Sequence, residues 1–83
     1  MENSALNTTA TDILNFLVEH GQAPSHHTLV NELGQDMLLI DEALMLLDRR
    51  GFADFYVAMV GEYASIEATD AGRAVVAAGQ KVS

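Results

Sequence analysis

Apolar residues in the first half of the chain recur at the spacing of helices. The pattern predicts helices over residues 9–20, 25–33 and 36–50. Each range opens on a Thr, Ser or Asp that can cap a helix, and each is followed by a glycine that can end it. Residues 22–24 are expected to form a turn, because the proline at position 24 disfavours helical geometry in the residue before it.

The second half of the chain follows a different pattern. Residues 52–60, FADFYVAMV, are rich in aromatic and β-branched side chains and predict a strand. A Gly-Glu turn follows, and residues 63–68 can return as the partner strand. Thr69 can cap a last short helix that ends at Gly79. The predicted fold class is therefore α+β, mainly α: a three-helix core, a two-stranded β-hairpin and a short C-terminal helix.

The chain is long enough for one domain, since it has 83 residues. That domain is expected over residues 9–78, with a frayed tail over 1–8 and a second tail over 79–83. There is no cysteine, which excludes disulfides and thiolate metal sites. The longest apolar runs are too short to cross a bilayer, and the first residues lack the basic-then-apolar order of a secretion signal. We therefore expect a cytoplasmic protein.

The order helix, helix, helix, hairpin, helix resembles that of a winged helix-turn-helix domain. Four segments carry the resemblance: ILNFLVEHG (13–21), SHHTLVNELG (25–34), IDEALMLLDRRGF (40–52) and IEATDAGRAV (66–75). The last is similar to the threonine, acid, small, glycine, arginine segment that follows the wing in several families of bacterial regulators. The resemblance covers about residues 9–78. It implies that the third helix reads DNA bases and that the hairpin is a wing against the DNA backbone.

The charge of the chain argues against this DNA-reading role. Twelve acids against four bases give a net charge of −8, whereas DNA binding needs clustered Lys and Arg. At 100° per residue, the outward side of the third helix carries Leu38, Asp41, Glu42, Met45 and Arg49, with Asp48 nearer its edge. Bases and phosphates are contacted by Arg, Lys, Asn, Gln or Ser instead. Nucleic acid is therefore not the expected partner.

An apolar pair inside a charged rim is typical of a protein–protein contact. Leu38 and Met45 form that pair, and Leu39 and Leu46 at its boundary widen the apolar strip. The predicted partner-binding residues are Leu38, Asp41, Glu42, Met45 and Arg49 of the third helix, and Tyr63 of the hairpin. The alternative interpretation is that single exposed Leu and Met residues are common and carry no function.

Two mechanisms fit a small acidic winged-helix protein that binds another protein. It could be an adaptor or inhibitor of a larger protein, as small phage or mobile-element proteins often are. Its acids could instead imitate nucleic acid and occupy a basic groove; the candidates are Asp41, Glu42, Asp48, Asp54 and Glu62. The alternative function is a dimeric DNA-binding transcriptional regulator, which would need Arg49, Arg50 and Arg73 together on one surface.

The remaining candidate residues predict no catalytic or metal site. Val75 and Val76 cannot both face one core, so one of them is a candidate dimer contact, unless the last helix simply covers its own core. His26 and His27 point about 100° apart at the start of the second helix, which favours capping roles over a shared metal ion. The chain has no phosphate loop and no nucleophile elbow, so we expect neither enzyme activity nor a cofactor.

Overall fold

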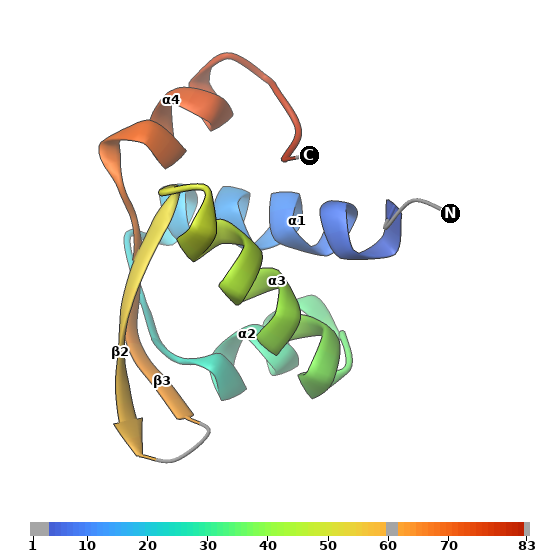
Figure 1. Ribbon diagram of the computed structural model, residues 1–83, viewed down its shortest axis with the longest axis vertical. Helices are drawn as coiled ribbons and strands as arrows, with labels where there is room; N and C mark the ends of the chain where they lie inside the picture. Colours follow the sequence, from blue (N-terminus) through green and yellow to red (C-terminus); the bar gives the residue numbers. More distant parts are fainter. Residues whose placement is uncertain (1–3, 60–61, 83) are drawn as a thin grey trace.

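The computed structural model describes residues 4–59 and 62–82 (Figure 1). Its elements, in chain order, are α1 (Ser4–His20), β1 (Ala23–Ser25), α2 (His26–Leu33), α3 (Met37–Arg49), β2 (Ala53–Met59), β3 (Glu62–Ala68) and α4 (Asp70–Ala77). Three helices, an antiparallel hairpin and a short C-terminal helix confirm the predicted α+β, mainly α fold class. The layout is compatible with that of a winged helix-turn-helix domain.

The caps that were predicted from the sequence set most of the helix ends. The Asp36 side chain accepts a hydrogen bond from the Leu38 amide at 3.2 Å and so starts α3. Gly34 ends α2 in the left-handed conformation, with φ at +65°, and its amide donates to the Val30 carbonyl. Ser25 stands at the N-cap position of α2, but its side chain makes no cap hydrogen bond, so the predicted capping role of Ser25 is wrong. Local chemistry therefore sets the end of α2 and the start of α3.

The start of α1 differs from the prediction. The helix begins at Ser4 rather than at Thr9, so residues 4–8 are helical and not part of a tail. Thr9 is buried inside the helix, and Leu6 packs against the core from the added residues. Burial of Leu6 is the physical reason for the extension, because an apolar side chain one turn upstream gains from docking on the same core.

A third strand, β1, was not predicted. Ala23 pairs with Ile66 and Ser25 pairs with Ala64, so β1 joins the hairpin in an antiparallel sheet of order β1-β3-β2. The expectation of a simple turn at residues 22–24 is therefore wrong. Ala23 is fully buried, and a buried segment needs partners for its backbone groups, which β3 supplies.

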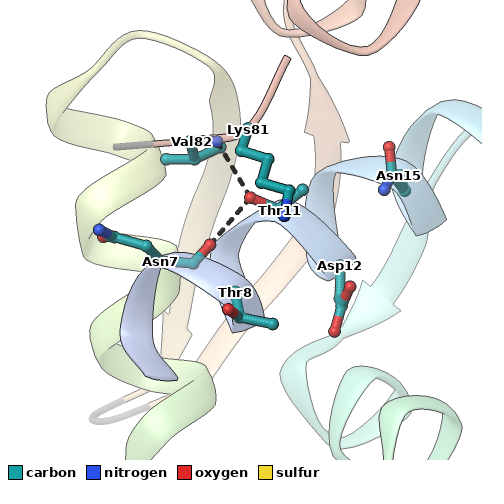
Figure 2. A pocket seen from close by; sticks show the side chains of 7 residues that line it. All are labelled: Asn7, Thr8, Thr11, Asp12, Asn15, Lys81 and Val82. Atoms are coloured by element: carbon teal, nitrogen blue, oxygen red, sulfur yellow. Dashed lines mark hydrogen bonds between the residues drawn. The ribbon is translucent and has the colours of Figure 1, made fainter. Parts of the chain in front are cut away.

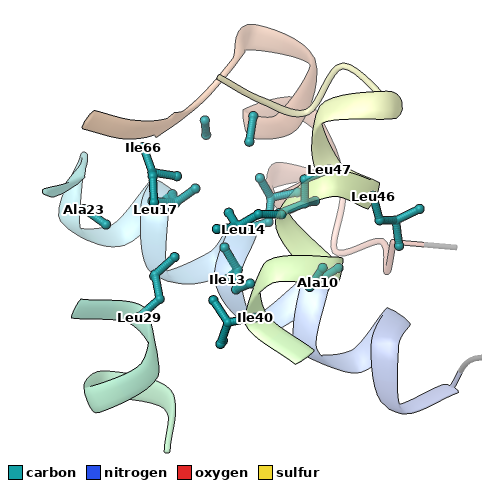
Figure 3. Packing of buried hydrophobic residues seen from close by; sticks show 14 of the residues in the cluster. Ala10, Ile13, Leu14, Leu17, Ala23, Leu29, Ile40, Leu46, Leu47 and Ile66 are labelled. Carbon is teal, nitrogen blue, oxygen red and sulfur yellow. The ribbon is translucent and has the colours of Figure 1, made fainter. Parts of the chain in front are cut away.

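The buried side chains form one cluster between α1, α3 and the sheet (Figure 3). Its largest fully buried members are Ile13, Leu14 and Leu17 of α1, Leu29 of α2, Ile40, Leu44 and Leu47 of α3, and Ile66 of β3. The segment after α4 returns to this core: Val82 is buried, and its amide donates to the Thr11 hydroxyl at 3.0 Å. Val82 thus packs on α1, whereas residues 79–81 are exposed.

The TDAGR segment ties the start of α4 to the end of α3. The Thr69 hydroxyl donates to the Gly51 carbonyl at 2.6 Å and accepts from the Gly72 amide at 3.1 Å. The Thr69 amide donates to the Phe52 carbonyl at 3.0 Å. A Cβ atom on Gly72 would lie 2.1 Å from that carbonyl oxygen and 3.0 Å from Leu14 Cδ1. The glycine is therefore required by the close approach of α4 to the chain that follows α3.

Candidate interaction surface

The outer side of α3 carries one exposed stripe of side chains. Leu38, Glu42, Met45 and Arg49 are all exposed, at the 4-3-4 spacing that places residues along one side of a helix. Leu38 is 66% exposed and Met45 is 48% exposed. These four residues are called the α3 stripe below. Their exposure agrees with the outward positions that the helical wheel gave them.

Asp41 does not belong to this stripe. Its side chain is half-buried and turns toward α2, where Oδ1 lies 3.8 Å from Nδ1 of His26. Among the residues that the structure describes, this buried oxygen has no hydrogen-bond partner. Asp48, which the helical wheel placed nearer the edge of the outward side, is exposed, so the partial burial of Asp41 comes from the neighbouring His26 and not from its angle on the helix. Asp41 is thus half-buried rather than fully on the open face, and its contact with a partner stays a prediction.

His26 connects α2 to β3 rather than capping a helix. Its side chain is buried, and Nδ1 accepts a hydrogen bond from the Tyr63 amide at 3.3 Å. Because Nδ1 accepts, the proton of the neutral ring is assigned to Nε2. The His26 and Tyr63 rings also meet edge to face, with centroids 5.5 Å apart. The predicted capping role is wrong for His26, since its partner lies 37 residues away.

Tyr63 packs the hairpin against the start of α2, where its ring meets that of His26. Its side chain is half-buried, and its ring centroid lies 4.5 Å from that of Phe55 on β2. Burial raises the pKa of the Tyr63 phenol, and the negative charges of Asp41 and Asp48 raise it further. Tyr63 is thus a partly covered residue between hairpin and helix, with acids beside it.

The apolar strip is narrower than the sequence indicated. Leu46 is only 6% exposed and belongs to the core cluster. Leu39 is half-buried and lines a surface hollow together with Ala5, Thr8 and Thr9 of α1. Because α1 begins at Ser4, its first turns lie beside this side of α3. The expectation that Leu39 and Leu46 widen the exposed strip is therefore wrong for Leu46 and holds in part for Leu39.

The hairpin adds two exposed apolar residues that the sequence analysis did not single out. Tyr56 is 72% exposed and Val57 is 65% exposed. Both lie on β2, which pairs with β3 on one side and is an edge strand of the sheet. Their strand neighbours Phe55 and Tyr63 are instead partly buried against the core, so the exposed residues lie on the part of β2 that the core does not cover. Figure 1 shows β2 on the outer side of the hairpin. Their place on a predicted strand at the edge of the sheet was the sequence feature that could have identified Tyr56 and Val57 as exposed.

Two further predictions concern α4. Val75 and Val76 are both half-buried against the core, so the premise that one of them must face away was wrong. Their role as a dimer contact stays a prediction. The Arg73 guanidinium donates to the Ala68 carbonyl at 2.9 Å and pairs with the Asp70 carboxylate. Arg49 and Arg50 are exposed at the end of α3.

A hollow of about 500 Å³ lies where the C-terminal segment returns to α1 (Figure 2). It is lined by Asn7, Thr8, Thr11, Asp12 and Asn15 of α1, and by Lys81 and Val82. The Thr11 hydroxyl already donates to the Asn7 carbonyl at 2.9 Å while it accepts from the Val82 amide. The central polar group of the hollow is thus used to hold the chain terminus in place.

Comparisons with known proteins assign this surface to no family. Comparison with protein-family models, with curated proteins and with solved structures gives no match for the chain. In the part of the chain that the structure describes, no helix combines the length and the apolar character needed to span a bilayer.

Proposed function

We propose that this chain is a small acidic protein of the winged helix-turn-helix type that acts by binding another protein through the α3 stripe. The observation that carries the proposal is the exposure of Leu38 and Met45 on a helix whose other large apolar residues are buried or half-buried. Full burial of a Leu or Met side chain contributes roughly 1.5–3 kcal/mol. Because Leu38 and Met45 expose 66% and 48% of their surface, a partner that covered both would gain roughly 2–3 kcal/mol from their burial.

The charge of the chain supports a polypeptide partner over DNA. Of the four basic residues, Arg73 is already paired with Asp70, and Lys81 lies at the far end of the chain beside α1. Arg49 and Arg50 would then have to neutralise DNA phosphates almost alone, against a net charge of −8. The alternative function, a DNA-binding transcriptional regulator, is disfavoured on this ground.

The acidic hairpin favours a partner with a basic surface. Asp54 and Glu67 are direct cross-strand partners, and both side chains are exposed. Like charges in such positions destabilise a sheet, and a Lys or Arg from a partner would relieve the repulsion. This supports an adaptor or inhibitor that covers a basic site of a larger protein, including the case in which the acids imitate nucleic acid.

A pull-down with matched variants tests the proposal. The wild-type chain and the Leu38→Ser/Met45→Ser variant would be immobilised and exposed to extract of the cells that encode them, with mass spectrometry as the readout. We expect a protein that the wild type retains and the variant loses. Val57→Ser, which removes an equally exposed apolar side chain from the hairpin, is the control. Loss with the control as well would mean general hydrophobic adhesion, and retention by both variants would contradict the proposal.

Two measurements complete the test. Thermal melts should place the stability of the Leu38→Ser/Met45→Ser variant near that of wild type, because surface substitutions usually change stability by no more than about 0.5 kcal/mol. Fluorescence anisotropy with a random DNA duplex at low salt addresses the alternative function. Saturable binding of the duplex there would favour the regulator over the protein-binding proposal.

A further inference from the structure

The charges of the α3 stripe are arranged differently from those of the rest of the chain. The chain carries −8 in total, but the stripe holds one acid, Glu42, and one base, Arg49. Glu42 lies three positions before Met45, and Arg49 lies four positions after it. At a rise of about 1.5 Å per residue, they lie roughly 5 and 6 Å from Met45 along the helix axis. The stripe is thus electrically neutral, with an apolar residue at its centre.

We propose that, in the free protein, the α3 stripe is covered by a second copy of this chain, with the two α3 helices antiparallel about a two-fold axis near Met45. This inference rests on the proposed function, because both take the α3 stripe as a protein-binding surface. It adds that a second copy of the chain covers the stripe when no other protein is bound. In this arrangement Glu42 of each copy faces Arg49 of the other, because the two residues lie almost equally far from Met45. The two Met45 side chains meet at the axis.

The same charges disfavour the parallel arrangement. It would place Glu42 against Glu42 and Arg49 against Arg49, and like charges in close contact are destabilising. The antiparallel arrangement also opposes the two helix dipoles and brings the Arg49 and Arg50 end of one helix near the Asp36 end of the other. Leu38, seven residues before Met45, then lies level with position 52 of the other copy, just beyond the end of its α3, so the helix-to-helix contact is made mainly by Glu42, Met45 and Arg49. The net charge of each copy does not prevent contact, because salt at physiological strength screens charges beyond about 8 Å.

Charge reversal tests the pairing directly. Sedimentation equilibrium from micromolar to millimolar protein would compare wild type, Glu42→Arg, Arg49→Glu and the double variant. We expect each single reversal to weaken the dimer by about tenfold, because both symmetric contacts become repulsive. The double variant restores opposite charges at both contacts, so its dissociation constant should return close to that of wild type. Glu42 and Arg49 are exposed, and circular dichroism would verify that each variant is folded.

Cysteine crosslinking gives a second readout, since the natural chain has no cysteine. A mixture of Glu42→Cys and Arg49→Cys chains should form mixed disulfides, whereas either variant alone should form few. A wild type that stays monomeric to millimolar concentration would overturn the dimer, as would a double variant no tighter than the single ones. Efficient crosslinking of Glu42→Cys with itself would contradict the antiparallel arrangement. In each of these cases the pull-down still decides separately whether the stripe binds a foreign protein.

Discussion

Replacing Gly72 by alanine is the sharpest test of how α4 docks on the end of α3. The residue lies in the helix Asp70–Ala77, where an alanine ordinarily improves helix stability by about 1 kcal/mol. At this position, however, the new Cβ would lie 2.1 Å from the Phe52 carbonyl oxygen and 3.0 Å from Leu14 Cδ1. The first distance is far below any van der Waals contact, so α4 or the Phe52 peptide has to move.

The cost of that movement follows from the bonds that it disturbs. Overpacking a tight contact costs typically about 1–3 kcal/mol. The Phe52 carbonyl also accepts the Thr69 amide, a hydrogen bond whose loss costs about 1 kcal/mol. The cap from Thr69 to the Gly72 amide contributes a similar amount. After the gain in helix propensity, we expect Gly72→Ala to destabilise the fold by about 2–4 kcal/mol. The whole domain has roughly 4–12 kcal/mol of stability.

Urea and thermal unfolding, followed by circular dichroism, measure this change. A loss of about 2–4 kcal/mol lowers the melting temperature of a domain of this size by at least about 8 °C. Gly79→Ala is the control, because Gly79 has a φ of +70° but nothing within 4 Å of its added Cβ. Its cost should be near 1 kcal/mol, from the left-handed backbone alone. A Gly72→Ala variant as stable as wild type, or more stable, would refute the steric reasoning.

Two further predictions concern Thr69 and Tyr63. Thr69→Val removes the hydroxyl that caps α4 and donates to the Gly51 carbonyl, so we expect the free energy of unfolding in urea to fall by about 1–2 kcal/mol. Thr69→Ser keeps a hydroxyl and should recover most of that stability. An unchanged unfolding midpoint for Thr69→Val would contradict the role of the hydroxyl. Burial, together with the charges of Asp41 and Asp48, raises the pKa of Tyr63 above its ordinary value of 10.0. The folded state therefore holds the phenolic proton more tightly than the unfolded state does. The resulting stabilisation is complete below pH 10 and is lost as pH rises through the folded pKa. Ultraviolet titration should therefore find Tyr63 ionising above pH 10, and Asp41→Asn should lower that pKa; a midpoint at or below the ordinary value would contradict the assigned burial.

Much of the secondary structure could be read from local patterns along the chain. The period of apolar residues located α2 and α3 closely, and Asp36, Gly34 and Thr69 act at the helix ends where their chemistry predicted. The same period placed Leu38 and Met45 on the open side of α3, where both are exposed. These features follow from contacts between residues a few positions apart, which is why a linear pattern carries them.

Contacts between distant segments account for what the patterns missed. The Val82 amide reaches Thr11 across 71 positions, and the Tyr63 amide reaches His26 across 37. No periodicity encodes such pairs, because each depends on how whole elements pack. The pairing of β1 with β3 has the same origin, since three residues are too few to give an alternating pattern.

Packing also decided how much of the predicted surface stays open. The helical wheel placed Leu46 at a boundary and Asp41 on the outward side of α3, but a pattern of angles cannot show which of these positions a neighbouring element covers. In the folded chain Leu46 joins the core, and Asp41 turns its carboxylate toward His26. What covers the edge of a helix depends on neighbouring elements that arrive from elsewhere in the chain. The centre of the exposed side was therefore readable from the order of residues, whereas its borders were set by the packing of α1, α2 and the hairpin around α3.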